Sequence, residues 1–237
     1  MRLALFGGTF DPIHCAHLRV ARAAADAFAL DRVLFAPTGR QPLKSAPAAA
    51  SYDDRLAMVA LALSHPCAES AAQPAPDPRF AVSALDAPRP GGQPNYTVDL
   101  LEDLARTHPE AALFAIAGAD SFLTLAQWRS PQRVLALAEW IVVSRPGLEL
   151  QSAAGSALIP TTHFPATHFL ARAEFAPLAL TPQHRTRIHL LPGIHQDISA
   201  TTLRQLLEAP SPGNDPAPTP WLSPAVAAYI REHHLYR

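Results

Sequence analysis

Short apolar runs alternate with longer segments of helical pattern along most of the chain. The apolar runs predict strands at residues 2–6, 32–36, 79–85, 112–117, 139–144 and 187–191. The segments between and after them predict helices at 14–28, 51–63, 98–106, 121–126, 131–138, 165–175, 199–208 and 223–235. Strands separated by helices predict right-handed crossovers and a mainly parallel, doubly wound sheet. We therefore expect an α/β fold in which residues 1–237 form a single domain without internal repeats.

The first strand runs into a glycine turn and then into a helix. Gly7 and Gly8 follow the apolar run, and Thr9 and Phe10 continue the turn. A strand, a glycine turn and a helix start form a phosphate site, because free backbone N–H groups and the helix dipole both point at the anion. Glycines have no Cβ, so a bulky triphosphate can approach the backbone closely.

Two histidines, His14 and His17, lie three residues apart at the start of this helix. Residues at i and i+3 share a helix face, so both imidazoles can point into one phosphate cavity. Taken alone, such a pair is better explained as two surface histidines or as half of a zinc site, which would need at least one more ligand. The glycine turn reverses that preference, because it would bind the anion that the histidines contact.

Two further segments carry groups that suit a polyphosphate. Ser199 and Thr201 have hydroxyls at the start of a late helix, and Arg204 follows on the same segment. Lys44 lies on a loop after the second strand, where a flexible cation can clamp phosphates as the loop closes. The alternatives are a capped helix with a solvated arginine and an ordinary solvated lysine.

A third group of residues suits recognition of a base. A tryptophan such as Trp128 can stack on a pyridine ring, and Thr97 with nearby backbone N–H groups can hold a carboxylate beside Tyr96. The pattern alone favours a core tryptophan and a helix cap at these positions. Gly118 and Asp120 follow the fourth strand, where Asp120 equally suits a helix cap.

Composition excludes several classes of function. The net charge is −1, which argues against a broad nucleic-acid interface. No stretch approaches the roughly 18 apolar residues of a membrane span, and the apolar N-terminus is too short for a signal peptide. Two cysteines, Cys15 and Cys67, give no disulfide framework, so a reduced, cytoplasmic setting is expected.

Two motifs resemble one enzyme family in sequence and in order. The stretch GGTFDPIHCAH at 7–17 resembles the (T/H)xGH signature of the nucleotidylyltransferase superfamily, and ISATTLR at 198–204 resembles its ISSTxxR motif. Two histidines, rather than threonine then histidine, resemble the nicotinate-mononucleotide adenylyltransferase branch. Three positions depart from the family pattern: Ala16 replaces a glycine, Leu43 a histidine and Ala200 a serine.

The resemblance implies a Rossmann-like fold of nucleotidylyltransferase topology and an adenylyl transfer. The 5′-phosphate of nicotinate mononucleotide would attack the α-phosphorus of ATP, releasing pyrophosphate and forming nicotinate adenine dinucleotide (deamido-NAD) for NAD biosynthesis. Mg²⁺ would arrive bound to ATP, without a dedicated protein metal site. The implied catalytic residues are His14, His17, Lys44 and Arg204. The implied ATP and phosphate contacts are Gly7, Gly8, Thr9, Phe10, Gly118, Asp120, Ser199 and Thr201, and the implied nicotinate site is Tyr96, Thr97 and Trp128.

The sequence is also consistent with other interpretations of these motifs. Within the superfamily, the acceptor could be nicotinamide mononucleotide or another phosphate ester. A dinucleotide-binding oxidoreductase is a less suitable alternative, because no G-x-G-x-x-G follows the first strand. A non-catalytic nucleotide sensor would bind ATP without releasing pyrophosphate.

Overall fold

A computed structural model describes residues 1–43, 46–67, 75–143, 164–165, 173–191, 198–208 and 220–237 of the chain. Its contacts divide the chain into two compact units. Unit 1 comprises Met1–Phe6, Val20–Val33 and Tyr96–Gln196, and unit 2 comprises Gly7–Arg19, Leu34–Asn95 and Asp197–Arg237. Each unit is therefore built from segments that lie far apart in the sequence.

The strands pair mainly in parallel. They are β1 (Arg2–Gly8), β2 (Arg32–Pro37), β3 (Phe80–Val82), β4 (Ala112–Gly118), β5 (Glu139–Val143), β6 (Phe164–Pro165) and β7 (Ile188–Leu191). In the described residues their order is β3-β2-β1-β4-β5-β7-β6. β1 pairs in parallel with β4, β4 with β5 and β5 with β7, while β6 is antiparallel to β7. The prediction of an α/β fold with a mainly parallel sheet is confirmed.

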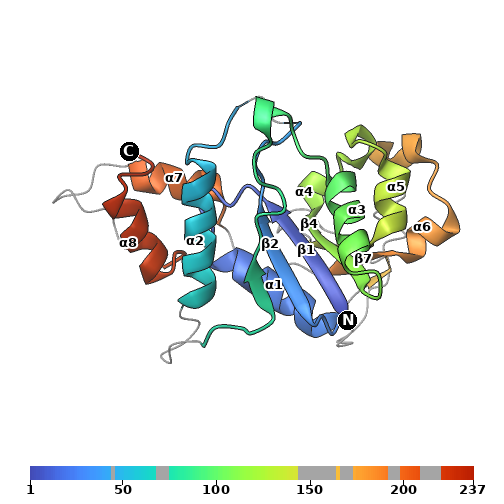
Figure 1. Cartoon of the computed structure of the whole chain (residues 1–237), viewed down its shortest axis with the longest axis horizontal. Helices are drawn as coiled ribbons and strands as arrows, with labels where there is room; N and C mark the ends of the chain where they lie inside the picture. The colour runs from blue at the N-terminus through green and yellow to red at the C-terminus, as the bar shows by residue number, and fades with distance from the viewer. Residues whose placement is uncertain (44–45, 68–74, 144–163, 166–172, 192–197, 209–219) are drawn as a thin grey trace, which may run out of the picture. The chain divides into compact units, whose positions relative to one another are not determined.

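Unit 1 has its core where apolar strands pair with one another. The register sets Leu3 opposite Leu113 and Ala115 opposite Trp140, and all four residues are buried. Continuous apolar runs are typical of parallel strands that are covered on both faces. Its helices are the later part of α1 (Cys15–Ala27), α3 (Thr97–Thr107), α4 (Ala119–Phe122), α5 (Pro131–Leu137) and α6 (Pro182–Thr186), together with short 3₁₀ turns. Helices α3 and α5 pack side by side (Figure 1).

Unit 2 contains the end of β1 and the helices that follow the candidate phosphate motifs. These helices are the start of α1 (Cys15–Ala27), α2 (Tyr52–Ser64), α7 (Ala200–Glu208) and α8 (Pro224–Glu232). Helices α2 and α8 pack against each other (Figure 1), and the Tyr229 hydroxyl donates to Asp54 Oδ1 at 3.0 Å between them. Ser51 caps α2 by accepting the Asp54 N–H at 3.1 Å, as its place before two acidic residues predicts.

Several local predictions were wrong. Thr97 was expected to cap α3, but Tyr96 is the N-cap residue and Thr97 is the first residue of the helix. A helix was expected over 165–175, but Pro165 belongs to strand β6 and a 3₁₀ helix covers Ala173–Leu178. Residues 166–172 lie outside the described part. The short helix α6 was missed. Within the described segments, no helix is both long enough and apolar enough to cross a membrane.

Candidate active site

The glycine turn after β1 is shaped by one aromatic ring. A Cβ on Gly8 would lie 3.0 Å from the ring of Phe10, so a larger residue at position 8 would displace that ring. Phe10 has a φ of 48°, is buried, and packs 5.9 Å from the ring of Phe35. A Cβ on Gly7 would meet no described atom within 4 Å. A residue larger than glycine at position 8 would thus press on the Phe10 ring, whereas Gly7 leaves open space beside the backbone.

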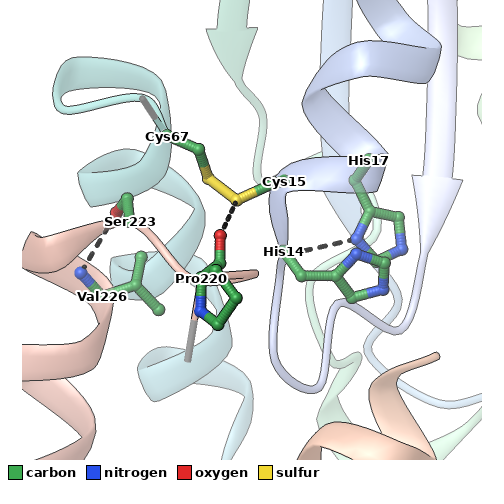
Figure 2. The surroundings of a disulfide bond; sticks show 7 residues. All are labelled: His14, Cys15, His17, Cys67, Pro220, Ser223 and Val226. Atoms are coloured by element: carbon green, nitrogen blue, oxygen red, sulfur yellow. Dashed lines mark hydrogen bonds between the residues drawn. A yellow bond between two sulfur atoms is a disulfide. The ribbon is translucent and has the colours of Figure 1, made fainter. Parts of the chain in front are cut away.

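The two histidines of the motif lie against each other, as their spacing predicts. Their ring centroids are 3.8 Å apart, with planes inclined at 36° (Figure 2). The His14 N–H donates to Nδ1 of His17 at 3.2 Å, so that nitrogen carries a lone pair and a neutral His17 bears its proton on Nε2. The ring of Phe10 meets His17 edge to face at 5.0 Å. Backbone and aromatic contacts together fix the orientation of this imidazole.

Two backbone N–H groups at this helix start donate hydrogen bonds to acceptors within the protein. The His14 N–H goes to His17, and the Cys15 N–H goes to the carbonyl of Trp221 at 2.8 Å. The expectation that N–H groups here would point freely at an anion is thus wrong for these two. Binding of an anion at this turn would therefore depend on side-chain donors more than binding at an ordinary helix N-terminus does.

The structure also corrects the interpretation of the two cysteines. Cys15, at the start of α1, forms a disulfide with Cys67, just beyond α2, with a Cα–Cα distance of 5.7 Å (Figure 2). The carbonyl oxygen of Pro220 lies 3.6 Å from Cys15 Sγ, a contact without a hydrogen bond because a bridged sulfur carries no proton. The residue after His14 is therefore covalently fixed to the end of α2.

Arg204 reaches the glycine turn from the far end of the sequence. Its Nη1 donates to the main-chain oxygen of Asp11 at 2.6 Å and lies 3.7 Å from Asp11 Oδ2. Its Nη2 donates to the Thr201 hydroxyl at 3.3 Å. The Ser199 hydroxyl accepts the Thr202 N–H at 3.1 Å and so caps α7. Unit 2 thus brings both predicted phosphate motifs together.

Sequence reasoning missed Arg55, which is buried on α2. Its guanidinium donates to the carbonyls of Thr9 and Thr38, both at 2.8 Å, and to that of Ala50 at 3.3 Å. Burial lowers the pKa of Arg55, and the negative charge of Asp11 opposes that shift. One buried cation therefore ties the glycine turn to the loop after β2 and to the segment before α2.

A buried carboxylate, Asp86, lies on the segment after β3. The Asn95 side-chain amide donates to it at 3.0 Å and to the carbonyl of Ala87 at 2.7 Å. Burial raises the pKa of Asp86 to about 6, against hydrogen bonds that lower it. A Cβ on Gly39 would lie 2.6 Å from the Asp86 carbonyl oxygen, so this approach requires glycine.

The predicted base-recognition residues belong to unit 1. Trp128 is half-buried: its indole N–H donates to the Thr124 hydroxyl at 2.9 Å, and its ring centroid lies 5.6 Å from that of Trp140. The Arg129 guanidinium lies 4.8 Å from the ring centroid of Tyr96. Trp128 is thus only partly in the core, and Tyr96 is the N-cap residue of α3 without a side-chain cap bond. Their role with substrate stays a prediction.

Three other residues predicted for the site are Gly118, Asp120 and Lys44. Gly118 is the N-cap residue of α4, and Asp120 is exposed in its first turn. Lys44 lies outside the described residues. Among the residues that are described, no three His, Cys, Asp or Glu side chains are grouped so that they could hold a metal ion.

Comparison with known proteins gives the family. The model of the cytidylyltransferase-like family matches residues 5–206. A probable nicotinate-nucleotide adenylyltransferase of Thermus thermophilus is 35% identical over 239 residues, covering 100% of each chain. The chain belongs to the nicotinate-nucleotide adenylyltransferases of this family. A probable member from Corynebacterium kroppenstedtii is 43% identical over 150 residues, which are 63% of this chain and 65% of that one.

Solved structures in the family share the fold. The nicotinic acid mononucleotide adenylyltransferase of Plasmodium falciparum, complexed with NaAD, aligns with a TM-score of 0.69 at 16% identity. The alignment covers 99% of this chain and 97% of that one. The Rossmann-like nucleotidylyltransferase fold implied by the motifs is therefore confirmed. The full-length relatives show that the protein is a nucleotidyltransferase.

Proposed function

We propose that this protein transfers the adenylyl group of ATP to nicotinate mononucleotide. The products are nicotinate adenine dinucleotide (deamido-NAD) and pyrophosphate, a step of NAD biosynthesis. The observation that carries the proposal is the paired imidazoles of His14 and His17 after the glycine turn, in the unit where Arg204 reaches that turn. Relatives of full length that bear the name of this activity support the same acceptor.

The reaction needs no nucleophile from the protein. An ionised oxygen of the substrate 5′-phosphate attacks the α-phosphorus of ATP in line. The new O–P bond forms as the bond from the α-phosphorus to the bridging oxygen breaks, and the electron pair leaves with pyrophosphate. Catalysis then depends on positioning and on charge stabilisation.

The side chains of unit 2 suit those two tasks. His14 and His17 donate to phosphate oxygens on which charge accumulates. Arg204 and Lys44 neutralise the leaving pyrophosphate, and a guanidinium can do so with two parallel hydrogen bonds. Gly7, Gly8, Thr9, Phe10, Ser199 and Thr201 line the phosphates. Mg²⁺ would come as part of the ATP substrate and would supply further positive charge at the phosphates.

Unit 1 supplies the residues for the remaining parts of the substrates. Trp128 stacks on the nicotinate ring, Tyr96 and Thr97 hold its carboxylate, and Gly118 and Asp120 contact the ATP ribose. Because each unit is assembled from separated segments, we treat residues 1–237 as one domain. A cytoplasmic location belongs to the same proposal, since ATP and pyridine nucleotides are its substrates.

The proposal is tested by pyrophosphate release from ATP and Mg²⁺ with two acceptors in parallel. Nicotinate mononucleotide is expected to support release at a much higher kcat/KM than nicotinamide mononucleotide. Equal rates, or a preference for the nicotinamide, would refute the acceptor. Binding of ATP without release with either acceptor would refute catalysis and favour a nucleotide sensor.

The histidine pair has its own test. His17→Ala removes a phosphate donor, so kcat is expected to fall at least ~100-fold, in the range seen when one transition-state donor is lost. His108→Ala, at a half-buried histidine that is the C-cap residue of α3, is the control and should retain wild-type kcat. Circular dichroism of both variants checks the fold. Near-wild-type turnover by His17→Ala would remove the role assigned to that histidine.

A further inference from the structure

The second-last residue of the chain reaches into the phosphate motif. Tyr236 is only 8% exposed, and its hydroxyl donates to Asp11 Oδ1 at 2.7 Å. Asp11 belongs to the turn between the paired glycines and His14, and it is the residue whose main-chain oxygen holds Arg204. A hydrogen bond across 225 residues thus joins the chain end to the site.

The backbone beyond α8 is shaped to deliver this side chain. His234 and Tyr236 have φ values of 54° and 59°, in the left-handed region that larger residues seldom adopt. The Leu235 N–H donates to the Ile230 carbonyl at 3.0 Å, which closes the helix in a Schellman-type turn. Two strained residues persist only where surrounding contacts favour them. The segment after α8 is therefore held in this conformation by its contacts.

The carboxylate of Asp11 is shared among three close donors. The N–H groups of Ala49 and Ala50 donate to it at 2.7 and 3.1 Å, and the Tyr236 hydroxyl is the third donor. Oδ1 accepts hydrogen bonds from the Ala50 N–H and the Tyr236 hydroxyl. Oδ2 accepts one from the Ala49 N–H and lies 3.7 Å from Arg204 Nη1. Three donors thus satisfy much of the hydrogen-bonding capacity of this buried carboxylate before Arg204 is counted.

We propose that Tyr236 is a positioning residue for Arg204, acting through the carboxylate of Asp11. This inference rests on the proposed function, in which Arg204 neutralises the leaving pyrophosphate. By holding Oδ1, the phenol keeps the carboxylate turned so that Arg204 remains 3.7 Å from Oδ2 and can divide its hydrogen bonds between protein and phosphate. Without the phenol, the poorly solvated carboxylate turns to Arg204 and holds it in a tight ion pair.

Other charges near this bond favour the phenol as a donor. Burial and the neighbouring Asp11 raise the pKa of Tyr236 well above its ordinary value, while Arg204 and Arg55 act in the opposite sense. The hydroxyl therefore stays protonated over the whole working range of pH. A protonated phenol can only lend its proton to the carboxylate, as this role requires.

The chain offers a matched control in Tyr229. Its hydroxyl also joins the C-terminal region to a carboxylate of unit 2, Asp54, at 3.0 Å, and the other oxygen of Asp54 accepts from the Ser51 hydroxyl before α2. Tyr236→Phe is expected to lower kcat about tenfold with a smaller change in the KM for ATP. Tyr229→Phe is expected to keep both constants. Similar melting temperatures for the two variants would show that lost stability does not explain the difference.

Pyrophosphate binding tests the route through Arg204 without using the acceptor. By calorimetry with pyrophosphate and Mg²⁺, Tyr236→Phe is expected to weaken binding about fivefold. In an Arg204→Gln background, the same change should alter neither Kd nor kcat further, because the group it positions is gone. Additive losses in the double variant, or wild-type constants for Tyr236→Phe, would overturn the inference. A wild-type protein that binds pyrophosphate but catalyses nothing would refute only the proposed function, and one that does not bind it would overturn both.

Discussion

The candidate phosphate residues of unit 2 and the candidate base residues of unit 1 are held by contacts of different range. The glycine turn of unit 2 is bonded by Arg55, Arg204 and Tyr236, which are 46, 193 and 225 residues away from their partners. In unit 1, the indole N–H of Trp128 donates to a hydroxyl four residues earlier, and its ring contacts that of Trp140, which lies nearby in the sequence.

This difference follows from what the two groups would do. Stabilising the charge of a leaving pyrophosphate requires donors that are fixed before the reaction, and buried hydrogen bonds from several segments provide that rigidity. Stacking on an aromatic ring tolerates small displacements, because its energy comes from contact area. We therefore expect changes in unit 2 to have larger effects than matched changes in unit 1, and the following predictions test that order.

The largest effect is expected for Arg55→Met. The change leaves the carbonyls of Thr9, Thr38 and Ala50 without their guanidinium donor, so the free energy of unfolding should fall by about 3–5 kcal/mol. Denaturant unfolding followed by circular dichroism measures it. Arg133→Met in unit 1 removes an exposed ion pair with Glu102 and should cost less than about 1 kcal/mol. Equal losses in the two variants would contradict the comparison.

Local features of the sequence were predicted well because their causes are local. The glycine turn, the face shared by His14 and His17, and the caps Ser51 and Ser199 each depend on residues within four positions of one another. The apolar runs predicted the parallel strands for the same reason. Pairing Arg204 with the glycine turn required the resemblance to a family, since no local pattern joins residues 193 positions apart.

The residues that were missed act only through tertiary contacts. In sequence, Arg55 resembles a solvated arginine on an amphipathic helix, and nothing in its neighbourhood indicates three buried carbonyl partners. In sequence, Tyr236 resembles an ordinary residue of the segment after the last helix. Cys15 and Cys67 are separated by 52 residues, and spacing alone cannot pair two cysteines. These three features can be recognised only from contacts in the folded protein, and the sequence around each residue gives no indication of them.

The next effect in size is expected from reducing the disulfide. Opening a loop of 52 residues increases the entropy of the unfolded chain, which corresponds to a loss of about 2–4 kcal/mol in the free energy of unfolding. Unfolding curves with and without dithiothreitol measure it. The reductant has one target, since the chain has two cysteines. Cys67→Ser should unfold like the reduced protein, and dithiothreitol should not change its unfolding curve. A reductant effect that persists in this variant would contradict the Cys15–Cys67 disulfide.

A pH-dependent effect is expected from Asp86. Its pKa is about 6 in the folded protein and about 4 in an unfolded chain, so between these values the folded state binds more protons. Stability from this group is therefore highest below pH 4 and falls as pH rises to 6, by about 2 kcal/mol. Asp86→Asn should remove that part of the pH dependence, measured as unfolding free energy from pH 4 to 8. Glu102→Gln, at a half-exposed carboxylate of unit 1, is the control and should leave the Asp86 contribution in place.

The smallest effect is expected at the proposed nicotinate site in unit 1. Trp128→Phe keeps an aromatic face but reduces the stacking area, so the KM for nicotinate mononucleotide should rise about three- to tenfold, or about 1 kcal/mol. The kcat and the KM for ATP should stay close to wild type, because the ring contributes equally to ground-state and transition-state binding. Thr124→Val removes the acceptor of the indole N–H and keeps the ring, so it separates orientation from stacking. If Thr124→Val raises the KM as much as Trp128→Phe does, the site depends on a fixed hydrogen bond, and the contrast between the two units no longer holds.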